Sequence, residues 1–86
     1  MAILVVDDDA ALRRALKRVL VTHGFAVELA ENGAEALARL RAHSFDAVVL
    51  DVTMPGSDGI EVCERLRAAG DRLPVLMLTA RHAVRD

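Results

Sequence analysis

The chain is poor in the residues that cross-link or stack inside a small protein. It contains no Trp or Tyr, two Phe and one Cys among its 86 residues. A single cysteine excludes an internal disulfide and fits a reducing compartment. Because apolar residues make up 53% and aromatics only 2%, the core must be aliphatic. At this length we expect one domain with a thin core.

An excess of one charge sign is also absent. The 11 basic and 13 acidic residues leave a formal net charge of −2, which does not indicate a nucleic-acid-binding surface. No apolar run approaches the ~20 residues that span a bilayer. Met1-Ala2 enters a predicted strand without a basic leader, so we expect no signal peptide. The expected location is therefore the cytoplasm, without membrane insertion.

Short apolar strands alternate with amphipathic helices along the whole chain. The predicted strands are Ile3–Val6, Val27–Leu29, Ala47–Leu50 and Val75–Leu78, and the predicted helices are Ala10–His23, Ala34–His43 and Gly59–Ala69. Asp9 is expected to cap the first helix. Gly24 and Gly70 are expected to end helices in the left-handed conformation. This pattern predicts an α/β domain whose parallel sheet is covered on both faces.

Helical spacing of apolar residues predicts which helix faces are buried. The expected buried residues are Leu12, Ala15, Leu16, Val19 and Leu20 in the first helix, Leu37 and Leu40 in the second, and Ile60, Cys63 and Leu66 in the third. Four basic residues of the first helix are interpreted as a solvated face, with partner docking as the alternative: Arg13, Arg14, Lys17 and Arg18.

Three predicted strands end on side chains that carry oxygen. The first runs into Asp7-Asp8-Asp9, the third ends at Asp51, and the fourth is followed by Thr79. The carboxyl ends of parallel strands share one edge of the sheet, which is where open α/β sheets bind ligands. Four carboxylates and a hydroxyl at that edge would suit a hard cation and a phosphoryl group.

Three segments together resemble the receiver domain of bacterial response regulators: Ile3–Asp9, Leu50–Gly59 and Pro74–Arg81. The most specific part is Met54-Pro55, with an Asp just before it and Asp58-Gly59 after it. The resemblance covers the whole chain. It implies a flavodoxin-like doubly wound sheet of strand order 2-1-3-4. It also implies a phosphoacceptor module of a two-component system rather than a stand-alone enzyme.

The resemblance assigns a role to each candidate residue. Asp51 would be the phosphoacceptor, taking a phosphoryl group from a histidine of a sensor kinase or phosphotransfer domain. Asp8, Asp51 and the backbone carbonyl of Thr53 would bind Mg²⁺ directly, and Asp7 would act through water. Thr79 would contact a phosphoryl oxygen. A metal suits the site because phosphoryl transfer requires positioning and charge neutralisation, and Mg²⁺ favours few carboxylates and several waters.

The chain departs from the family in having four predicted strands where receivers have five. The only lysine, Lys17, is on the first helix, so the lysine of the family's last strand has no counterpart. We interpret residues 1–86 as a partial receiver domain, the N-terminal part of a DNA-binding transcriptional regulator, with no effector domain. In this order Val75–Leu78 lies at an edge, and we expect self-association there or completion by segments outside the chain.

Two other functions fit parts of the pattern. Asp7-x-Asp9 also resembles the haloacid-dehalogenase phosphohydrolases, with Asp7 as nucleophile and Asp9 as acid. Those enzymes usually place a small or hydroxyl residue soon after the second Asp, and they need a lysine and a cap. The other alternative is a phosphorylation-independent interaction domain. Phosphate labelling distinguishes the three functions: on Asp51, on Asp7, or nowhere.

Overall fold

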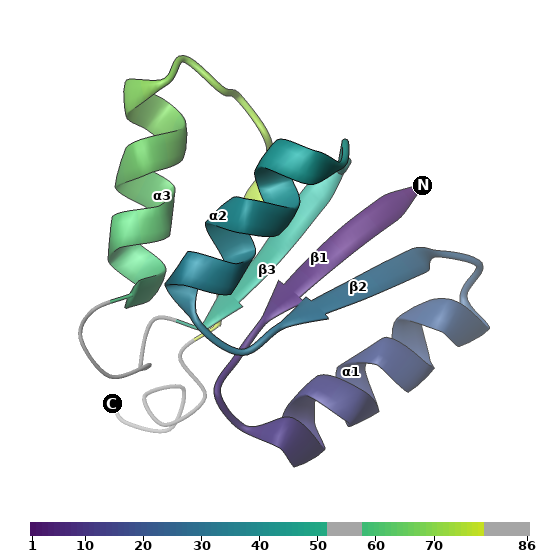
Figure 1. Cartoon of the computed structure of the whole chain (residues 1–86). Helices are drawn as coiled ribbons and strands as arrows, with labels where there is room; N and C mark the ends of the chain where they lie inside the picture. The colour runs from purple at the N-terminus through teal and green to yellow at the C-terminus, as the bar shows by residue number, and fades with distance from the viewer. Residues whose placement is uncertain (52–57, 79–86) are drawn as a thin grey trace, which may run out of the picture.

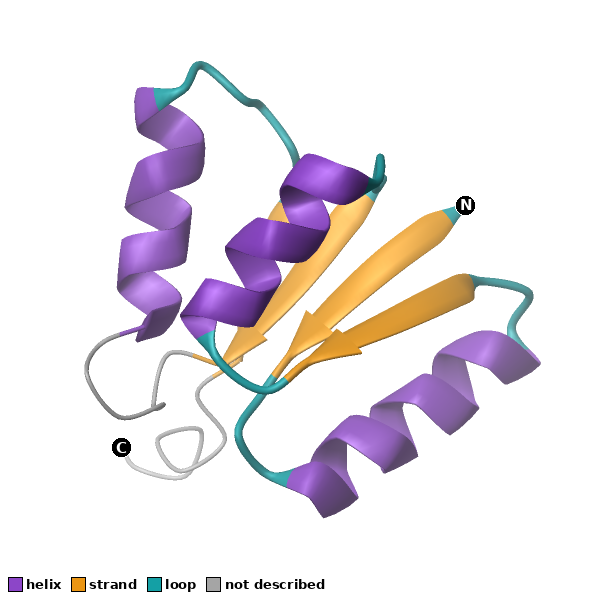
Figure 2. Cartoon of the chain, in the orientation of Figure 1, coloured by secondary structure: helices purple, strands orange, loops and turns teal. Residues whose placement is uncertain are grey.

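The computed structural model describes residues 1–51 and 58–78, and the structural statements below concern this part of the chain. Its elements are β1 (Ala2–Val6), α1 (Ala10–Thr22), β2 (Ala26–Ala30), α2 (Gly33–Ala42), β3 (Ala47–Asp51), α3 (Asp58–Ala68) and β4 (Val75–Leu78). Every predicted element is present, and no end is shifted by more than one residue. Figure 2 shows the alternation of strands and helices.

The four strands form one parallel sheet in the order β2-β1-β3-β4. β1 lies in the middle, where Ile3 pairs with Val27 on one side and Ala47 on the other. Helices α2 and α3 cover one face of the sheet and α1 covers the other (Figure 1). This is the flavodoxin-like doubly wound arrangement with strand order 2-1-3-4, as predicted.

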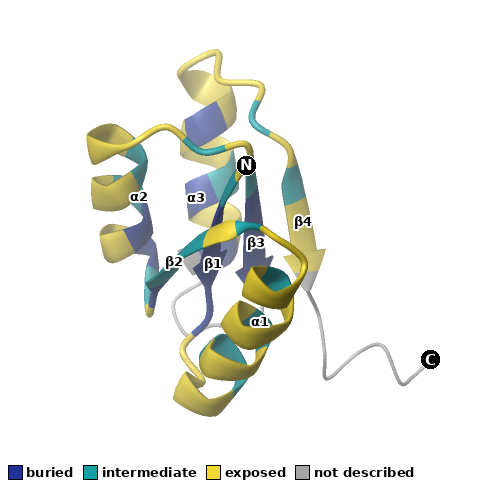
Figure 3. Cartoon of the chain, turned by 90° about the vertical axis from the view of Figure 1, so that its right-hand side faces the viewer, coloured by how far each residue is buried: buried dark blue, intermediate teal, exposed yellow. Residues whose placement is uncertain are grey.

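The two faces of the sheet differ in how completely they are buried (Figure 3). Under α2 and α3 the buried cluster consists of Leu4, Val6, Ala30, Ala36, Val48, Leu50, Val62 and Leu66. Under α1 it consists only of Ile3, Val5 and Val49, with half-buried side chains around it. The aliphatic core is therefore confirmed, and most of it lies on the α2–α3 side.

The predicted helix faces are only partly correct. In α3, Ile60 is 46% exposed, whereas Val62 is fully buried with Leu66. The buried face of α3 contains Gly59, Val62 and Leu66. Relative to the predicted face, its first two positions lie one residue earlier, which corresponds to a turn of about 100° around the helix. In α2 the fully buried side chain is Ala36, which was not predicted. The predicted pair of α2 leucines packs half-buried against the same core.

Helix α1 is buried less than predicted. Three of its leucines are half-buried, and none of its residues is fully buried. Ala15 and Val19 are exposed instead of buried. The predicted caps are confirmed: the Asp9 side chain accepts hydrogen bonds at the N-terminus of α1, and Gly24 and Gly70 have φ of 93° and 79°. No helix in the ranges 1–51 and 58–78 has the length and apolarity needed to cross a membrane.

Candidate functional site

The site lies where β1 and β3 end side by side. Val6 pairs with Leu50 in the parallel register. Asp7, the residue after β1, and Asp51, the last residue of β3, therefore lie at the same level of the sheet. Asp8 is the next residue of the β1–α1 connection. Carboxylate oxygens of these three residues all lie within 4.8 Å of one another. The side chains of Asp7 and Asp51 are buried, while Asp8 is exposed. The predicted gathering of carboxylates at the carboxyl edge is confirmed for these three residues.

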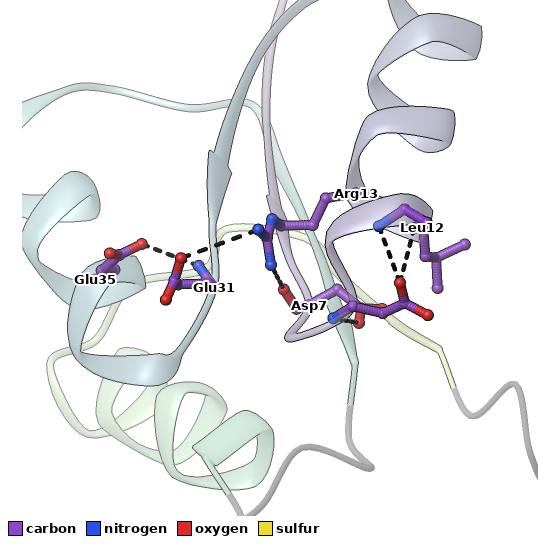
Figure 4. A network of polar contacts seen from close by, with 7 residues as sticks. Asp7, Leu12, Arg13, Glu31 and Glu35 are labelled. Carbon is purple, nitrogen blue, oxygen red and sulfur yellow. Dashed lines mark hydrogen bonds and ion pairs between the residues drawn. The ribbon is translucent and has the colours of Figure 1, made fainter.

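Asp7 is held by hydrogen bonds on almost every polar atom. Its N–H donates to the Ala30 carbonyl at 3.1 Å, and its Oδ1 accepts from the N–H of Asp9 at 2.8 Å. Its carbonyl accepts from Nη1 of Arg13 at 2.6 Å (Figure 4). Its Oδ2, by contrast, is buried and has no hydrogen-bond partner among the described residues. A buried carboxylate oxygen without a partner is costly, and a proton or a cation relieves that cost.

The electrostatics of Asp7 agree with this geometry. Burial raises the pKa of Asp7 above its ordinary value of 3.8, and the hydrogen bond from the Asp9 N–H opposes the rise. The neighbouring carboxylates of Asp51 and Asp8 raise the pKa further, because a second negative charge is unfavourable so close by. The site therefore brings three carboxylates together, and their mutual repulsion is a cost that a proton or a cation would relieve.

These residues fit a hard divalent cation. All the available ligand atoms are carboxylate oxygens, which Mg²⁺ and Ca²⁺ prefer. A cation here would also relieve the cost of burying Oδ2 of Asp7, which has no hydrogen-bond partner in the part of the chain that the structure describes. Within the part of the chain that the structure describes, Asp7, Asp8 and Asp51 are the one group of three or more potential metal-binding side chains.

The remaining candidates are placed differently. Asp9 accepts from the N–H groups of Ala11 and Leu12 at 2.9 and 3.2 Å, so its carboxylate caps α1. This use of Asp9 argues against its role as an acid in a phosphohydrolase. Thr53 and Thr79 lie outside the described residues, so their predicted roles stay predictions.

Sequence reasoning misplaced Arg13. We expected it on a solvated face, but its side chain is only 15% exposed and reaches the backbone of Asp7. The other three basic residues of that face are exposed as expected. The sequence did contain one sign that Arg13 is unusual. It is a cation in the first turn of a helix, where the positive end of the helix dipole disfavours a positive charge.

The fold and the acidic cluster together define a class of protein. The model of the response regulator receiver domain family matches residues 3–86, and the chain belongs to this family. Among curated proteins, the chain is 55% identical over 86 residues to the response regulator MprA of Mycobacterium avium (strain 104). That match covers all of this chain and 38% of MprA, so the chain spans about two-fifths of this relative's length.

Solved structures agree with the family. The response regulator TrrA of Thermotoga maritima, in complex with Mg²⁺-BeF, is 39% identical with a TM-score of 0.87. That match covers 98% of this chain and 73% of TrrA. TrrA in complex with the histidine kinase ThkA gives a TM-score of 0.85 at 39% identity, covering 99% and 73% of the two chains. The chain is therefore at least part of a receiver domain of the response-regulator type, and its acidic cluster is consistent with Mg²⁺.

Proposed function

We propose that this receiver domain accepts a phosphoryl group on Asp51 in a two-component system, with Mg²⁺ as its cofactor. The observation that carries the proposal is the convergence of Asp7, Asp8 and Asp51 at the carboxyl edge of the sheet, where the buried Oδ2 of Asp7 has no hydrogen-bond partner among the described residues. A solved relative, TrrA, contains Mg²⁺-BeF. The role is regulatory rather than that of a stand-alone enzyme.

Each residue of the site has a separate role in this proposal. Asp51 sits at the end of a buried strand, which fixes the direction of its carboxylate. One of its oxygens forms a bond to phosphorus while the bond between phosphorus and the donor's histidine nitrogen breaks. Asp8 and Asp51 would hold Mg²⁺ directly together with the Thr53 carbonyl, and Asp7 would act through water. When bound, Mg²⁺ supplies charge neutralisation for the phosphoryl oxygens. Thr79 would contact one of those oxygens.

A labelling experiment tests this function. The 86-residue chain is incubated with Mg²⁺ and a small acyl-phosphate donor and is then analysed by mass spectrometry. We expect one base-labile phosphoryl group on Asp51, and none on Asp51→Asn. Asp46→Asn, which changes an aspartate at the opposite end of the sheet, is the matched control and should label like wild type. We expect slow labelling, because the only lysine, Lys17, is exposed on α1 and a positive partner for the transferring charge accelerates such steps.

Other labelling results would support another function. A phosphoryl group on Asp7 would indicate phosphohydrolase chemistry. No label on the wild-type chain would indicate an interaction domain that works without phosphorylation. Label that persists on Asp51→Asn at the wild-type level would exclude Asp51 as the acceptor.

The proposal extends to partners and to the longer protein. We propose a sensor histidine kinase or phosphotransfer domain as the phosphoryl donor, supported by the solved complex of TrrA with ThkA. We also propose that residues 1–86 are part of one receiver domain. In this proposal that domain belongs to a cytoplasmic DNA-binding transcriptional regulator and binds no nucleic acid itself. The match to a response regulator more than twice as long as this chain supports this view.

Self-association through β4 is the last part of the proposal. β4 ends the described sheet, and Leu76 on this strand is 61% exposed. Edge strands with exposed apolar side chains pair readily with another strand. We therefore expect light scattering on the 86-residue chain to show dimers or larger species. A monodisperse monomer at high concentration would contradict this expectation.

A further inference from the structure

Arg13 differs from the other basic residues of α1. Its side chain is only 15% exposed, whereas those of Arg14, Lys17 and Arg18 are exposed. It turns back along the helix and donates from Nη1 to the carbonyl of Asp7 at 2.6 Å. Figure 4 shows its guanidinium lying between the β1–α1 connection and the β2–α2 connection.

Local preference does not explain this placement. Arg13 is in the first turn of α1, where the positive end of the helix dipole disfavours a cation. Partial burial of a guanidinium adds a desolvation cost. A short charge-assisted hydrogen bond to the Asp7 carbonyl offsets these terms. A residue that opposes local preference and is held by one strong contact is typical of a functional site.

The second contact of Arg13 is weaker. Nη2 lies 4.0 Å from Oε2 of Glu31, whose side chain is 59% exposed. Ion pairs of this kind stabilise proteins little. Glu31 itself is fixed through its backbone, because its N–H donates to Oε1 of Glu35 at 3.0 Å. The contact that matters is therefore the one to Asp7.

This contact acts on the backbone of a residue in the acidic cluster. The N–H of Asp7 is already bound to the Ala30 carbonyl, and Arg13 fixes the carbonyl on the other side of the same residue. Carboxylates within 4.8 Å of one another repel. Rotation of the turn formed by Asp7 and Asp8 would relieve that repulsion by separating the carboxylates. A donor on the Asp7 carbonyl opposes the rotation.

We infer that Arg13 is a positioning residue of the acidic site: its hydrogen bond to the Asp7 carbonyl keeps Asp7 and Asp8 directed toward Asp51 for metal binding. This inference rests on the proposed Mg²⁺ site. It assigns to a basic residue of α1 a role in the site rather than in a docking surface.

The test compares Mg²⁺ dissociation constants by calorimetry on the 86-residue chain. Arg13→Met keeps the length of the side chain and removes the donors. Arg14→Met removes the same charge one residue later on the exposed side of the same helix. We expect Arg13→Met to weaken Mg²⁺ binding about five- to tenfold, Arg14→Met to change it less than about twofold, and Arg13→Lys to restore part of the affinity. Glu31→Gln should bind like wild type, because its ion pair is long and exposed.

The sign of the effect separates positioning from simple electrostatics. Removing a positive charge near three carboxylates should tighten Mg²⁺ binding if only charge matters. Tighter or unchanged binding by Arg13→Met, measured beside Arg14→Met, would overturn the inference while leaving the proposed function intact.

A second measurement needs no metal. Amide hydrogen exchange of Asp9, whose N–H donates to Oδ1 of Asp7, should be faster in metal-free Arg13→Met than in Arg14→Met. Equal exchange rates in the two variants would overturn the inference. If wild type binds no Mg²⁺, the proposed metal site is wrong, and this exchange rate still decides whether Arg13 fixes the Asp7 turn.

Discussion

The two ends of the sheet use aspartate in opposite ways. At the amino end, Asp46 is exposed, its Oδ2 accepts from the N–H of Ala2 at 2.7 Å, and its own N–H donates to the Ala2 carbonyl at 2.7 Å. This pair of bonds joins the start of β3 to the start of β1. At the carboxyl end, Asp7 is buried beside two other carboxylates and keeps an oxygen without a described partner. An aspartate side chain thus stabilises the fold where it accepts a hydrogen bond away from other charges, and destabilises the fold where other carboxylates lie beside it.

The largest effect should come from neutralising the carboxyl end. Asp7→Asn keeps the acceptor for the Asp9 N–H and places an amide donor near the other two carboxylates. Two charges about 5 Å apart repel by about 3 kcal/mol at an effective dielectric of 20. We expect the variant to be more stable than metal-free wild type by up to this amount at neutral pH, measured by urea unfolding. A variant less stable than wild type would show that Asp7 supports the fold.

The pH dependence of this difference has a defined sign. The folded-state pKa of Asp7 is raised, so the native state holds the proton more tightly than the unfolded chain does. This contribution to stability is complete below the ordinary pKa of 3.8 and is lost as the pH rises through the folded-state value. The advantage of Asp7→Asn over wild type should therefore be smallest in acid and grow as the pH rises. An advantage that stays constant with pH would contradict this cause.

Mg²⁺ binding at the carboxyl end should change the free energy of unfolding by a smaller amount. At a concentration of about ten times its dissociation constant, Mg²⁺ adds about 1.4 kcal/mol of stability, which raises the Tm of a chain this size by several degrees. Asp8→Asn should stabilise the metal-free chain and bind Mg²⁺ more weakly, so that its Tm shifts less. Thermal melting of wild type that is unaffected by millimolar Mg²⁺ would show that the proposed metal site is wrong.

The smallest effect should come from the amino end, with the opposite sign. Asp46→Ala leaves the exposed Ala2 N–H to water and should cost about 1 kcal/mol. Circular dichroism melts would show a lower Tm, with no change in the response to Mg²⁺. A stabilised Asp46→Ala variant would mean that the two ends do not differ in the way proposed here.

The parts of the fold that the sequence predicted depend on local chemistry. The ranges of strands and helices, the Asp9 cap and the two glycines with positive φ all follow from neighbouring residues, and all are confirmed. The meeting of Asp7 and Asp51 was also predictable, because the carboxyl ends of neighbouring parallel strands share one edge.

The parts that were missed depend on contacts that the spacing of apolar residues does not describe. Ile60 and Val62 are both apolar, so the pattern alone does not show which of them faces the sheet, and packing against α2 and the strands decides it. Arg13 has the spacing of a surface residue, and its contact with Asp7 lies six residues back along the chain. A long flexible side chain can turn toward a loop, and periodicity contains no information about that choice.

The central position of β1 also determines when the site can form as the chain folds. β1 is synthesised first, but its partners begin 24 and 44 residues later, as the pairs Ala2–Ala26 and Ile3–Ala47 show. Contacts this far apart in sequence close large loops and slow folding. On a ribosome, β1 can pair with β2 first, but its other edge stays unpaired until β3 has emerged. Asp7 and Asp51 therefore meet only after more than half of the chain has been made.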